Sequence, residues 1–475
     1  MANRPNVLIF MVDQQRYDAC GCFGSRICRT PSLDRLAAEG IRFTHAYTST
    51  TLCTPARASL WTGLWPTHHG LLINTHWRHP VTKGRLDDGI PTLATIFRSA
   101  GYATAHFGKW HVGPDSDMPR LGFDRVVTRT DFANALQAAG KRFKLRDVIE
   151  RGYIVANYPF AGITSADDED FLEIWLCRRA EDWLAERAKH PDTPFFGCIS
   201  LPGPHPGYVV PERYAALYDP DRIPLWPNID DDLEDKPGVQ RLFRHDVMKS
   251  DTLSHDDWRK CVARYYAFVT LIDEQFGRIL DLLGKLNRAQ DTLVLFLTDH
   301  GDLIGAHGLW DKGPVMYDEQ LHIPIVARWP GVIPAGATCD AMVSLLDLMP
   351  TLVDAAGLSL PSPVDGRSLW PFFLGQTVPD WPDDVYVQYN GEGISLYTMR
   401  AVRSRRHKYV YYPYDRHELY DLQADPWELC NLISDPAYAP VLEKMRARMA
   451  DWMERSDDVV VEWNVGITPQ QARRW

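Results

Sequence analysis

NVLIFMV, from Asn6 to Val12, is the stretch of sequence that decides the fold of this 475-residue chain. The run is continuously apolar and ends at Asp13. A strand that is buried on both faces of a parallel sheet has this pattern, with its first polar residue at the carboxyl end. Further runs that indicate strands follow at Tyr102–Phe107, Phe195–Leu201, Thr292–Thr298 and His322–Arg328.

Helical patterns alternate with these strands. The most regular is Tyr265–Leu283, whose apolar residues recur at helical spacing on one face. Two segments, Pro114–Asp168 and Asp219–His255, have no sustained period and are interpreted as surface insertions. The alternation predicts an α/β fold, with a large, mostly parallel sheet sandwiched by helices. Other helices are predicted at Pro31–Gly40, Ala58–Leu64, Thr92–Ala100, Asp170–Ala188 and Val343–Ala356.

The pattern of the chain changes after about residue 380. We therefore expect an α/β domain over residues 1–378, followed over residues 379–475 by a smaller C-terminal α+β subdomain with a short antiparallel sheet and a tail. The segments on which this rests are Tyr386–Tyr389, Tyr397–Arg403 and Lys408–Tyr412, which alternate like antiparallel strands, and the helical pattern of Ala439–Arg455.

The chain is acidic, with 51 lysines and arginines against 62 aspartates and glutamates and a formal net charge of −11. Binding to nucleic acids or to anionic membranes needs a basic surface, so the composition argues against both functions. No apolar run approaches the roughly 20 residues of a transmembrane helix. The first residues also lack the long apolar region of a secretory signal. We therefore expect a cytoplasmic protein.

The cysteines point to the same compartment. There are nine, an odd number scattered along the chain, which favours reduced thiols over a disulfide framework. Cys20, Cys22 and Cys28 lie close together, and zinc binding is the sharpest interpretation of that cluster. No fourth cysteine or histidine stands nearby at ligand spacing, so small buried residues beside a loop are preferred.

Polar side chains follow three of the predicted strands. Asp13-Gln14 and Asp299-His300 come directly after their strands, and Lys109-Trp110-His111 follows shortly after a third. In open α/β sheets, ligands bind outside the carboxyl ends of the strands. Two carboxylates, an amide and one imidazole suit a hard divalent cation better than tetrahedral zinc. Each pair could instead cap a helix or turn, but three coincident strand ends weaken that alternative.

The densest signal is Cys53-Thr54-Pro55-Ala56-Arg57, which continues to Thr62-Gly63. One interpretation is a loop and a helix start without a chemical role. Another is a nucleophilic cysteine whose thiolate is favoured by Arg57 and the helix N-terminus.

This segment resembles the C-x-P-x-R signature of the type I sulfatases, a family of the alkaline phosphatase superfamily. The resemblance covers almost the whole chain, in order and at plausible spacing. It includes the opening strand with Asp13, Gly101-Tyr102-Ala103-Thr104 running to Gly108-Lys109-Trp110-His111, Thr298 to Asp302, His307 to Leu309, and Glu418 to Leu422.

The resemblance implies an alkaline-phosphatase-like catalytic domain and a modified cysteine. Cys53 would be oxidised to formylglycine by dedicated generating machinery and hydrated to a geminal diol. One divalent metal, most plausibly Ca²⁺ with Mn²⁺ or Mg²⁺ as alternatives, would be held by a diol oxygen of residue 53 together with Asp13, Gln14, Asp299 and His300. Arg57 would stabilise the diol.

Four further residues would act on the substrate. Lys109 and His111 would flank the diol, while Lys312 and His205 would contact the sulfuryl and leaving-group oxygens. One diol oxygen, its pKa lowered by the metal, would attack sulfur in line while Lys109, Lys312 and the cation offset the charge on the equatorial oxygens. His205 would protonate the leaving oxygen, and His111 would later remove a proton from the second hydroxyl to release the sulfate.

The sequence departs from the family pattern at the first strand end. Most sulfatases carry two adjacent aspartates where this chain has Asp13-Gln14, and Asp-Gln resembles choline sulfatases and phosphonate monoester hydrolases. Asn74 also resembles an active-site asparagine of the latter group. Phosphonate monoester hydrolases lack the G-K-x-H block present here as Gly108–His111. A sulfate monoester is therefore preferred over a phosphonate monoester or phosphodiester.

The leaving group is predicted to be hydroxylated or anionic, as in a sulfated sugar, although an aryl sulfate is also possible. This expectation rests on the segment His76-Trp77-Arg78-His79 near Asn74, which could also merely line the surface. Choline is disfavoured, because a quaternary ammonium requires an aromatic cage and Trp77 and Trp110 are too few to establish one.

Three remaining expectations concern the whole chain. An inactive, anion-binding relative is disfavoured, because every chemically required position is filled. The tail from Val459 to Trp475 suggests packing on a neighbouring subunit in a homo-oligomer, with a frayed terminus as the alternative. His307 is interpreted as a local turn residue.

Overall fold

An eight-stranded sheet forms the centre of the molecule, with strand order β12-β2-β11-β10-β1-β8-β4-β5. The structure, a computed structural model, describes residues 4–75, 83–150, 159–391 and 397–458. All neighbouring strands of this sheet run parallel except at β11, which is antiparallel to both β10 and β2. The strands are β1 (Asn6–Val12), β2 (Ile41–Phe43), β4 (Ala103–Gly108), β5 (Arg125–Val127), β8 (Phe195–Ser200), β10 (Thr292–Thr298), β11 (Ile325–Arg328) and β12 (Ala337–Cys339).

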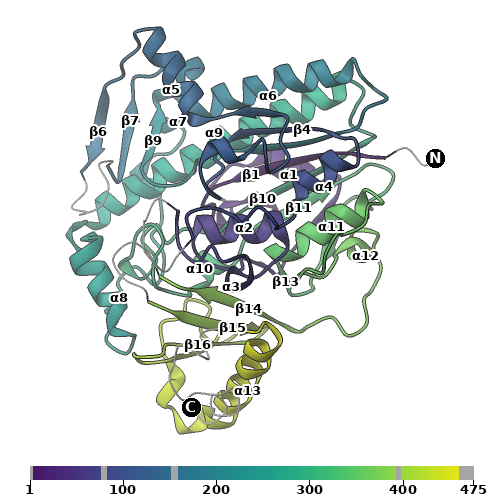
Figure 1. The fold of residues 1–475 in the computed structure, drawn as a ribbon. Coiled ribbons are helices and arrows are strands. Elements are labelled where there is room, and N and C mark those ends of the chain that lie inside the picture. Colours follow the sequence, from purple (N-terminus) through teal and green to yellow (C-terminus); the bar gives the residue numbers. More distant parts are fainter. Residues whose placement is uncertain (1–3, 76–82, 151–158, 392–396, 459–475) are drawn as a thin grey trace.

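Helices cover both faces of the sheet, as the apolar first strand requires (Figure 1). Leu8, Phe10 and Val12 of β1 belong to one core with α1 (Pro31–Ala38), α6 (Leu172–Ala188) and α9 (His255–Lys285). Val7, Ile9 and Met11 belong to a second core with α2 (Cys53–Thr62), α4 (Leu93–Ser99) and α11 (Leu348–Ala355). Alternate residues of β1 therefore serve opposite layers, and the predicted α/β sandwich is confirmed.

Several element boundaries differ from the sequence prediction. The helix expected at Ala58–Leu64 begins at Cys53, because the first turn of a helix tolerates Pro55. The helix expected from Val343 begins as strand β13 (Val343–Ser344), which pairs with β3 (Ala46–Tyr47), and α11 follows only after a short 3₁₀ turn.

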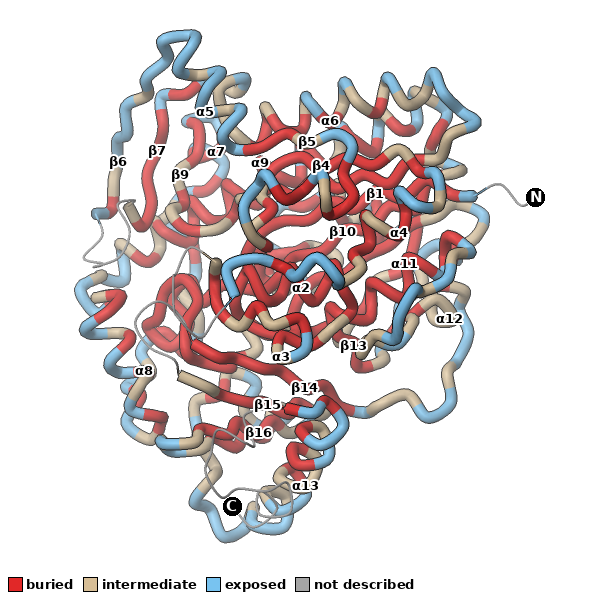
Figure 2. The backbone as a smooth tube through the Cα atoms, in the orientation of Figure 1, coloured by how far each residue is buried: buried red, intermediate tan, exposed pale blue. Residues whose placement is uncertain are grey.

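The segment interpreted as an insertion also contributes regular structure. It supplies β5 to the main sheet, together with α5 (Arg129–Ala138), β6 (Leu145–Ile149) and β7 (Ala161–Thr164). Strands β6 and β7 form a small three-stranded sheet with β9 (Tyr208–Pro211). Figure 2 shows that β1 and β10 are buried throughout, whereas α5 and most of β6 are exposed. The other short helices are α3 (Pro66–His69), α7 (Glu212–Ala215), α8 (Gly238–Leu242), α10 (Asp318–Leu321) and α12 (Trp370–Phe373).

The C-terminal part contains a four-stranded antiparallel sheet, as expected. One of its faces packs on α13 (Ala439–Arg455) through Met445, Met449 and Met453. The other packs on Tyr47 and Leu321 of the main body. The division of the chain at residue 378 stays a prediction. The strands are β14 (Asp384–Tyr389), β15 (Met399–Ser404), β16 (His407–Tyr411) and β17 (Glu418–Asp421).

Among the described residues, no helix is both long enough and apolar enough to cross a bilayer.

We expect Phe10→Ala to lower the free energy of unfolding by about 3–5 kcal/mol, because a buried aromatic side chain would leave a cavity. Phe10 is fully buried. The centroid of its ring lies 4.7 Å from that of Phe276 in α9 and 6.0 Å from that of Phe296 in β10. Denaturant unfolding measures the change. Leu242→Ala, at a side chain that is 52% exposed, is the control and should change stability by less than about 0.5 kcal/mol. Equal effects of the two substitutions would contradict this account of the core.

Candidate active site

The candidate site lies where parallel strands of the main sheet end together. Residue pairing aligns Val12 of β1 with Thr298 of β10, and Ser200 of β8 with both Met11 and Gly108. The residues that follow these strand ends therefore meet at one edge of the sheet. Helix α2 begins at the same edge, and its first residue is Cys53.

Four buried side chains form a possible metal site. Ligand atoms of Asp13, Cys53, Asp299 and His300 all lie within 4.8 Å of one another. Cys53 Sγ is 3.2 Å from His300 Nε2 and 3.6 Å from Asp13 Oδ1. Because His300 Nδ1 lies 2.9 Å from the Gly301 carbonyl oxygen, Nδ1 carries the proton and Nε2 presents its lone pair to the cluster. Two carboxylates and one imidazole fit a divalent cation.

Arg57 joins the carboxylates of this cluster. Its guanidinium donates to Asp299 Oδ2 at 2.8 Å and to Asp13 Oδ2 at 3.1 Å, and it also donates to the Lys109 carbonyl oxygen and Ser200 Oγ. Burial alone would raise the pKa of Asp13, but Lys109 and Arg57 outweigh it, so that pKa lies well below its ordinary value. Asp13 is therefore ionised and ready to bind a cation.

Gln14 is held by a second set of polar contacts. Its side-chain oxygen accepts a hydrogen bond from Lys312 Nζ at 3.0 Å, and its amide nitrogen donates to Asp302 at 2.9 Å and to Asp311 at 2.8 Å. Burial and Asp311 raise the pKa of Asp302 to about 8. A carboxylate at position 14 would add a third acidic group beside these two and could not donate to both of them. The amide donates to both, and its oxygen accepts from the Lys312 ammonium.

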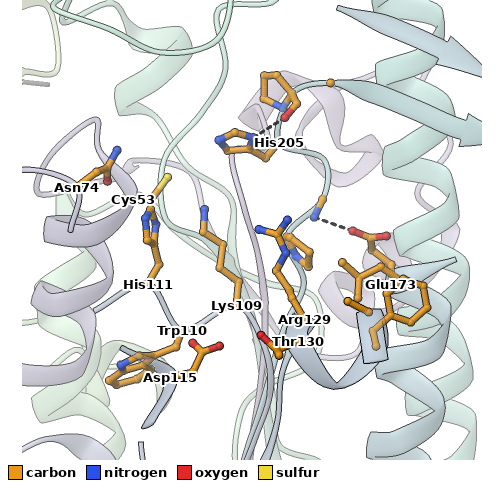
Figure 3. Close-up of a pocket in the computed structure, with 18 of the residues that line it drawn as sticks. Cys53, Asn74, Lys109, Trp110, His111, Asp115, Arg129, Thr130, Glu173 and His205 are labelled. Atoms are coloured by element: carbon orange, nitrogen blue, oxygen red, sulfur yellow. Dashed lines mark hydrogen bonds between the residues drawn. The ribbon is translucent and has the colours of Figure 1, made fainter. Parts of the chain in front are cut away.

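The other predicted residues line a cavity of about 1210 Å³ above the cluster (Figure 3). Lys109 forms an ion pair with Asp13. Figure 3 shows His111 beside Cys53, with Lys109 and His205 reaching into the same space. Asn74 Oδ1 accepts a hydrogen bond from the backbone N–H of Thr54 at 3.0 Å. All of the predicted site residues are thus brought to one place.

Lys312 and His205 form a pair within this cavity. Lys312 Nζ lies 2.9 Å from His205 Nε2, and His205 Nδ1 lies 2.6 Å from the Pro206 carbonyl oxygen. Burial and Lys312 lower the pKa of His205 to about 3. The imidazole is therefore neutral, with its proton on Nδ1 and with Nε2 accepting from Lys312.

The thiol of Cys53 is a poor nucleophile as it stands. Burial, followed by the negative charge of Asp13, raises its pKa to about 12. The Arg57 guanidinium, which could have favoured the thiolate, is engaged by Asp13 and Asp299. Simple thiolate catalysis is therefore disfavoured at neutral pH.

Glu173 is a cavity residue that the sequence analysis missed. It lies in the first turn of α6 and is 3% exposed, and its Oε1 accepts a hydrogen bond from the Gly203 N–H at 3.0 Å. The Gly203 carbonyl in turn accepts from the Asp13 N–H at 3.1 Å. Glu173 thus ties the loop that carries His205 to the end of β1. An acidic residue beside the apolar positions of a predicted helix was its only signal in the sequence.

Other predicted residues lie away from the cluster or outside the described part of the chain. The Trp110 ring packs among Trp61, His106 and Phe123 in the core. His307, at φ 55°, bonds Asp231 and stacks on Tyr317, as a local turn residue. Within the described chain, Cys20, Cys22 and Cys28 form no metal-ligating group. The predictions for His76, Trp77, Arg78, His79 and the tail from Val459 to Trp475 concern residues outside the described ranges.

Comparisons with known proteins identify the family of the chain. The family model for sulfatases matches residues 5–358, and a model for the C-terminal part of N-sulphoglucosamine sulphohydrolase matches residues 305–455. A choline-sulfatase from Rhizobium meliloti is 31% identical over 491 residues, which cover 99% of this chain and 90% of that protein. A Δ4,5-hexuronate-2-O-sulfatase from Bacteroides thetaiotaomicron is 27% identical over 481 residues, which cover 98% and 92% of the two chains. The crystal structure of a phosphonate monoester hydrolase from Agrobacterium radiobacter has a TM-score of 0.80 at 26% identity and covers 95% of this chain and 96% of its own.

The Glu173 carboxyl makes the stability of the protein depend on pH. Burial raises its pKa from 4.5 to about 7, so the folded chain binds this proton more tightly than the unfolded chain. The stability that this proton provides is present below the unfolded pKa and is lost as pH rises through the folded pKa. Glu173→Gln keeps an acceptor for the Gly203 N–H but removes the titration.

Between about pH 5 and pH 8, we therefore expect the unfolding free energy of the unsubstituted protein to fall by about 2 kcal/mol relative to Glu173→Gln. Denaturant unfolding of both proteins at the two pH values measures this difference. If the two proteins differ in unfolding free energy by the same amount at both pH values, Glu173 is not the titrating group.

Proposed function

Because the chain belongs to the sulfatase family and is a sulfatase, we propose that it hydrolyses sulfate monoesters of small hydroxylated or aryl compounds through a formylglycine at residue 53 and a bound divalent ion. The bond between sulfur and the ester oxygen breaks, water supplies the oxygen that remains on sulfur, and the leaving oxygen takes a proton. One observation carries the proposal. The side chain of Cys53 points into the Asp13–Asp299–His300 cluster, at the base of a cavity lined by Lys109 and Lys312.

The residues that would hold the ion are Asp13, Asp299, His300 through Nε2 and Gln14 through its side-chain oxygen, together with residue 53. With oxygen in place of sulfur at residue 53, the donors are mostly oxygen, which favours Ca²⁺, with Mn²⁺ and Mg²⁺ as alternatives. When present, the ion and the formylglycine supply an activated oxygen nucleophile.

The protein's own cations would bind the sulfate group. Lys109 and Lys312 reach the cavity from different loops, and their ammonium groups can offset charge on the sulfuryl oxygens as the ester bond breaks. Arg57 is fully engaged by Asp13, Asp299, Ser200 and the Lys109 backbone. Its part is to hold the carboxylates in place beneath the substrate.

Proton delivery to the leaving oxygen falls to the Lys312–His205 pair. The His205 ring is oriented by the Pro206 carbonyl, and its Nε2 already accepts from Lys312. An anionic sulfate ester beside this pair would draw Lys312 toward its oxygens and raise the pKa of His205. Nε2 could then take up a proton and pass it to the ester oxygen. His111, beside Cys53, would accept a proton from residue 53 when the sulfate is released.

The first prediction concerns the nucleophile. Protein produced with the formylglycine-generating machinery should contain a peptide around residue 53 that is about 18 Da lighter than the cysteine form. Cys53→Ala should lower kcat/KM for 4-nitrophenyl sulfate by at least about 1000-fold, because no other group can replace the nucleophile. Cys430→Ala, at an exposed free cysteine, is the matched control and should leave the rate unchanged. Full activity in Cys53→Ala would refute the proposal.

A phosphonate monoester or phosphodiester hydrolase is the second candidate function. The likeness to the Agrobacterium radiobacter phosphonate monoester hydrolase favours it, as do Gln14 and the position of Asn74 beside Cys53. The Lys109–His111 segment at the cavity favours sulfate.

We therefore expect kcat/KM for 4-nitrophenyl sulfate to exceed that for an aryl phosphonate monoester and an aryl phosphodiester by about tenfold or more, a difference of about 1.4 kcal/mol in transition-state binding. Some turnover of the phosphorus esters is expected, because they present similar tetrahedral oxyanions. Steady-state rates on one batch of modified enzyme decide between the two, and a preference of several orders of magnitude for a phosphorus ester would assign the second function.

A further inference from the structure

Arg129 is a cation of the cavity that the catalytic groups do not use. It is the first residue of α5, and its side chain is among those that line the cavity. Figure 3 shows its guanidinium pointing into the space that Lys109 also enters. Arg129 is an exposed residue of the cavity lining, within reach of a molecule that enters the cavity.

The three lysines and arginines of the described cavity lining differ in their partners. Lys109 is paired with Asp13, and Lys312 lies 3.1 Å from Asp311. Within the described chain, no carboxylate lies within ion-pairing distance, 4.0 Å, of Arg129. The positive charge of the exposed Arg129 is thus available to a molecule bound in the cavity.

Three carboxylates lie near Arg129. Asp131, two residues along α5, accepts hydrogen bonds from the Thr128 N–H at 2.7 Å and the Thr128 hydroxyl at 3.0 Å, and so caps the helix. Glu173 accepts from Gly203, and its raised pKa shows that burial outweighs the attraction of Arg129. Asp115, an exposed residue of the same cavity lining, is attracted by Arg129, but desolvation outweighs this attraction and raises the pKa of Asp115. Within the described chain, none of the three forms an ion pair with Arg129.

The arrangement of charge calls for a ligand with more than one negative group. Arg129 and Lys109 share one space and repel each other there, which offers no benefit to folding. A single sulfate held between Lys109 and Lys312 would use the charge at the base of the cavity and leave Arg129 without a partner. The cavity, at about 1210 Å³, exceeds the few hundred to 1000 Å³ typical of small-molecule sites, so it has room for a leaving group beyond the sulfate.

We propose that Arg129 selects the leaving group by binding a second anionic group of the substrate, a carboxylate or a second sulfate. The proposal rests on the sulfatase function proposed above and names its substrate class as sulfate esters of acidic sugars. Planar guanidinium groups bind carboxylate and sulfate oxygens through paired hydrogen bonds. Phe132 and Phe268 also line the cavity and offer apolar surface to a sugar ring.

The same arrangement opposes a cationic leaving group. Choline sulfate would bring its quaternary ammonium toward Arg129 and Lys109, two charges of the same sign. The Trp110 ring, which could have formed part of an aromatic cage, is packed among Trp61, His106 and Phe123. The chain is therefore expected to differ in substrate from its choline-sulfatase relative.

The test compares Arg129→Gln and Arg129→Lys with the unsubstituted enzyme, all carrying formylglycine as verified by mass spectrometry. Four substrates are used: 4-nitrophenyl sulfate, an O-sulfated hexuronate, a disulfated hexosamine and choline sulfate. Arg125→Gln is the matched control, because Arg125 is exposed on the neighbouring β5 and lies outside the described cavity lining.

We expect Arg129→Gln to lower kcat/KM about 10- to 100-fold for the acidic sugar that is the better substrate, chiefly through KM, because a charge-assisted pair is lost. For 4-nitrophenyl sulfate, kcat/KM of Arg129→Gln should stay within about twofold of the unsubstituted enzyme. For choline sulfate, kcat/KM should not fall on this substitution. Arg129→Lys should recover part of the lost kcat/KM, since lysine keeps the positive charge but lacks the planar guanidinium that can donate two parallel hydrogen bonds. A larger fall in kcat/KM for the O-sulfated hexuronate would identify the second group as a carboxylate, and a larger fall for the disulfated hexosamine would identify it as a sulfate.

Two failures can be told apart. If the unsubstituted, modified enzyme hydrolyses none of the four sulfates, the sulfatase substrate proposal fails. If it hydrolyses 4-nitrophenyl sulfate but Arg129→Gln changes all substrates equally, or choline sulfate is the best substrate, the role of Arg129 is refuted while the sulfatase function stands. Increasing salt should raise KM for the acidic sugar in the unsubstituted enzyme more than in Arg129→Gln, and an equal increase would also count against the proposal.

Discussion

The buried guanidinium of Arg57, held between Asp13 and Asp299, is the interaction on which the rest of the site depends. The three side chains come from α2 and from the ends of β1 and β10, and all are at most 1% exposed. Ion pairs that are removed from water stabilise only when every member keeps its partner, and removing one member commonly costs 3–5 kcal/mol. Arg57 also bonds the Lys109 carbonyl and Ser200, at the ends of β4 and β8. One side chain therefore fixes four strand ends and the start of α2 relative to one another, which places Cys53 over the two carboxylates.

In the cavity above this network, acidic and basic side chains lie at different depths. Acidic groups lie at the base, where Arg57 and Lys109 compensate them, and Lys312 and Arg129 reach the space above. The net charge of −11 describes the whole surface and hides this local cationic region. A protein that binds anions can be acidic overall, because the field within a cleft is set by the nearest groups rather than by the total.

Local patterns predicted what depends on neighbours along the chain. The apolar run Asn6–Val12 and the periodic helix Ala439–Arg455 have the predicted bounds, and the motifs around Cys53 and Asp299 identified the residues that meet at the strand ends. The contacts that depend on three-dimensional packing could not be read in this way. Gln14 bonds Asp302 and Asp311 nearly 300 residues away, and Glu173 reaches the site only because α6 crosses beside the Gly203 loop. Arg129 looked like part of a surface insertion, because its sequence neighbours are polar and nothing local indicates that α5 begins at the cavity wall.

Gln14 connects the metal site to the choice of substrate through charge. A second aspartate at this position would add a negative charge beside Asp302 and Asp311, whose proximity already raises the pKa of Asp302 to about 8. The amide removes that conflict by donating to both, and its oxygen accepts from Lys312. Lys312 is paired with Asp311, whereas Arg129 forms no ion pair within the described chain, so an ester with two anionic groups would match the cavity better than an ester with one.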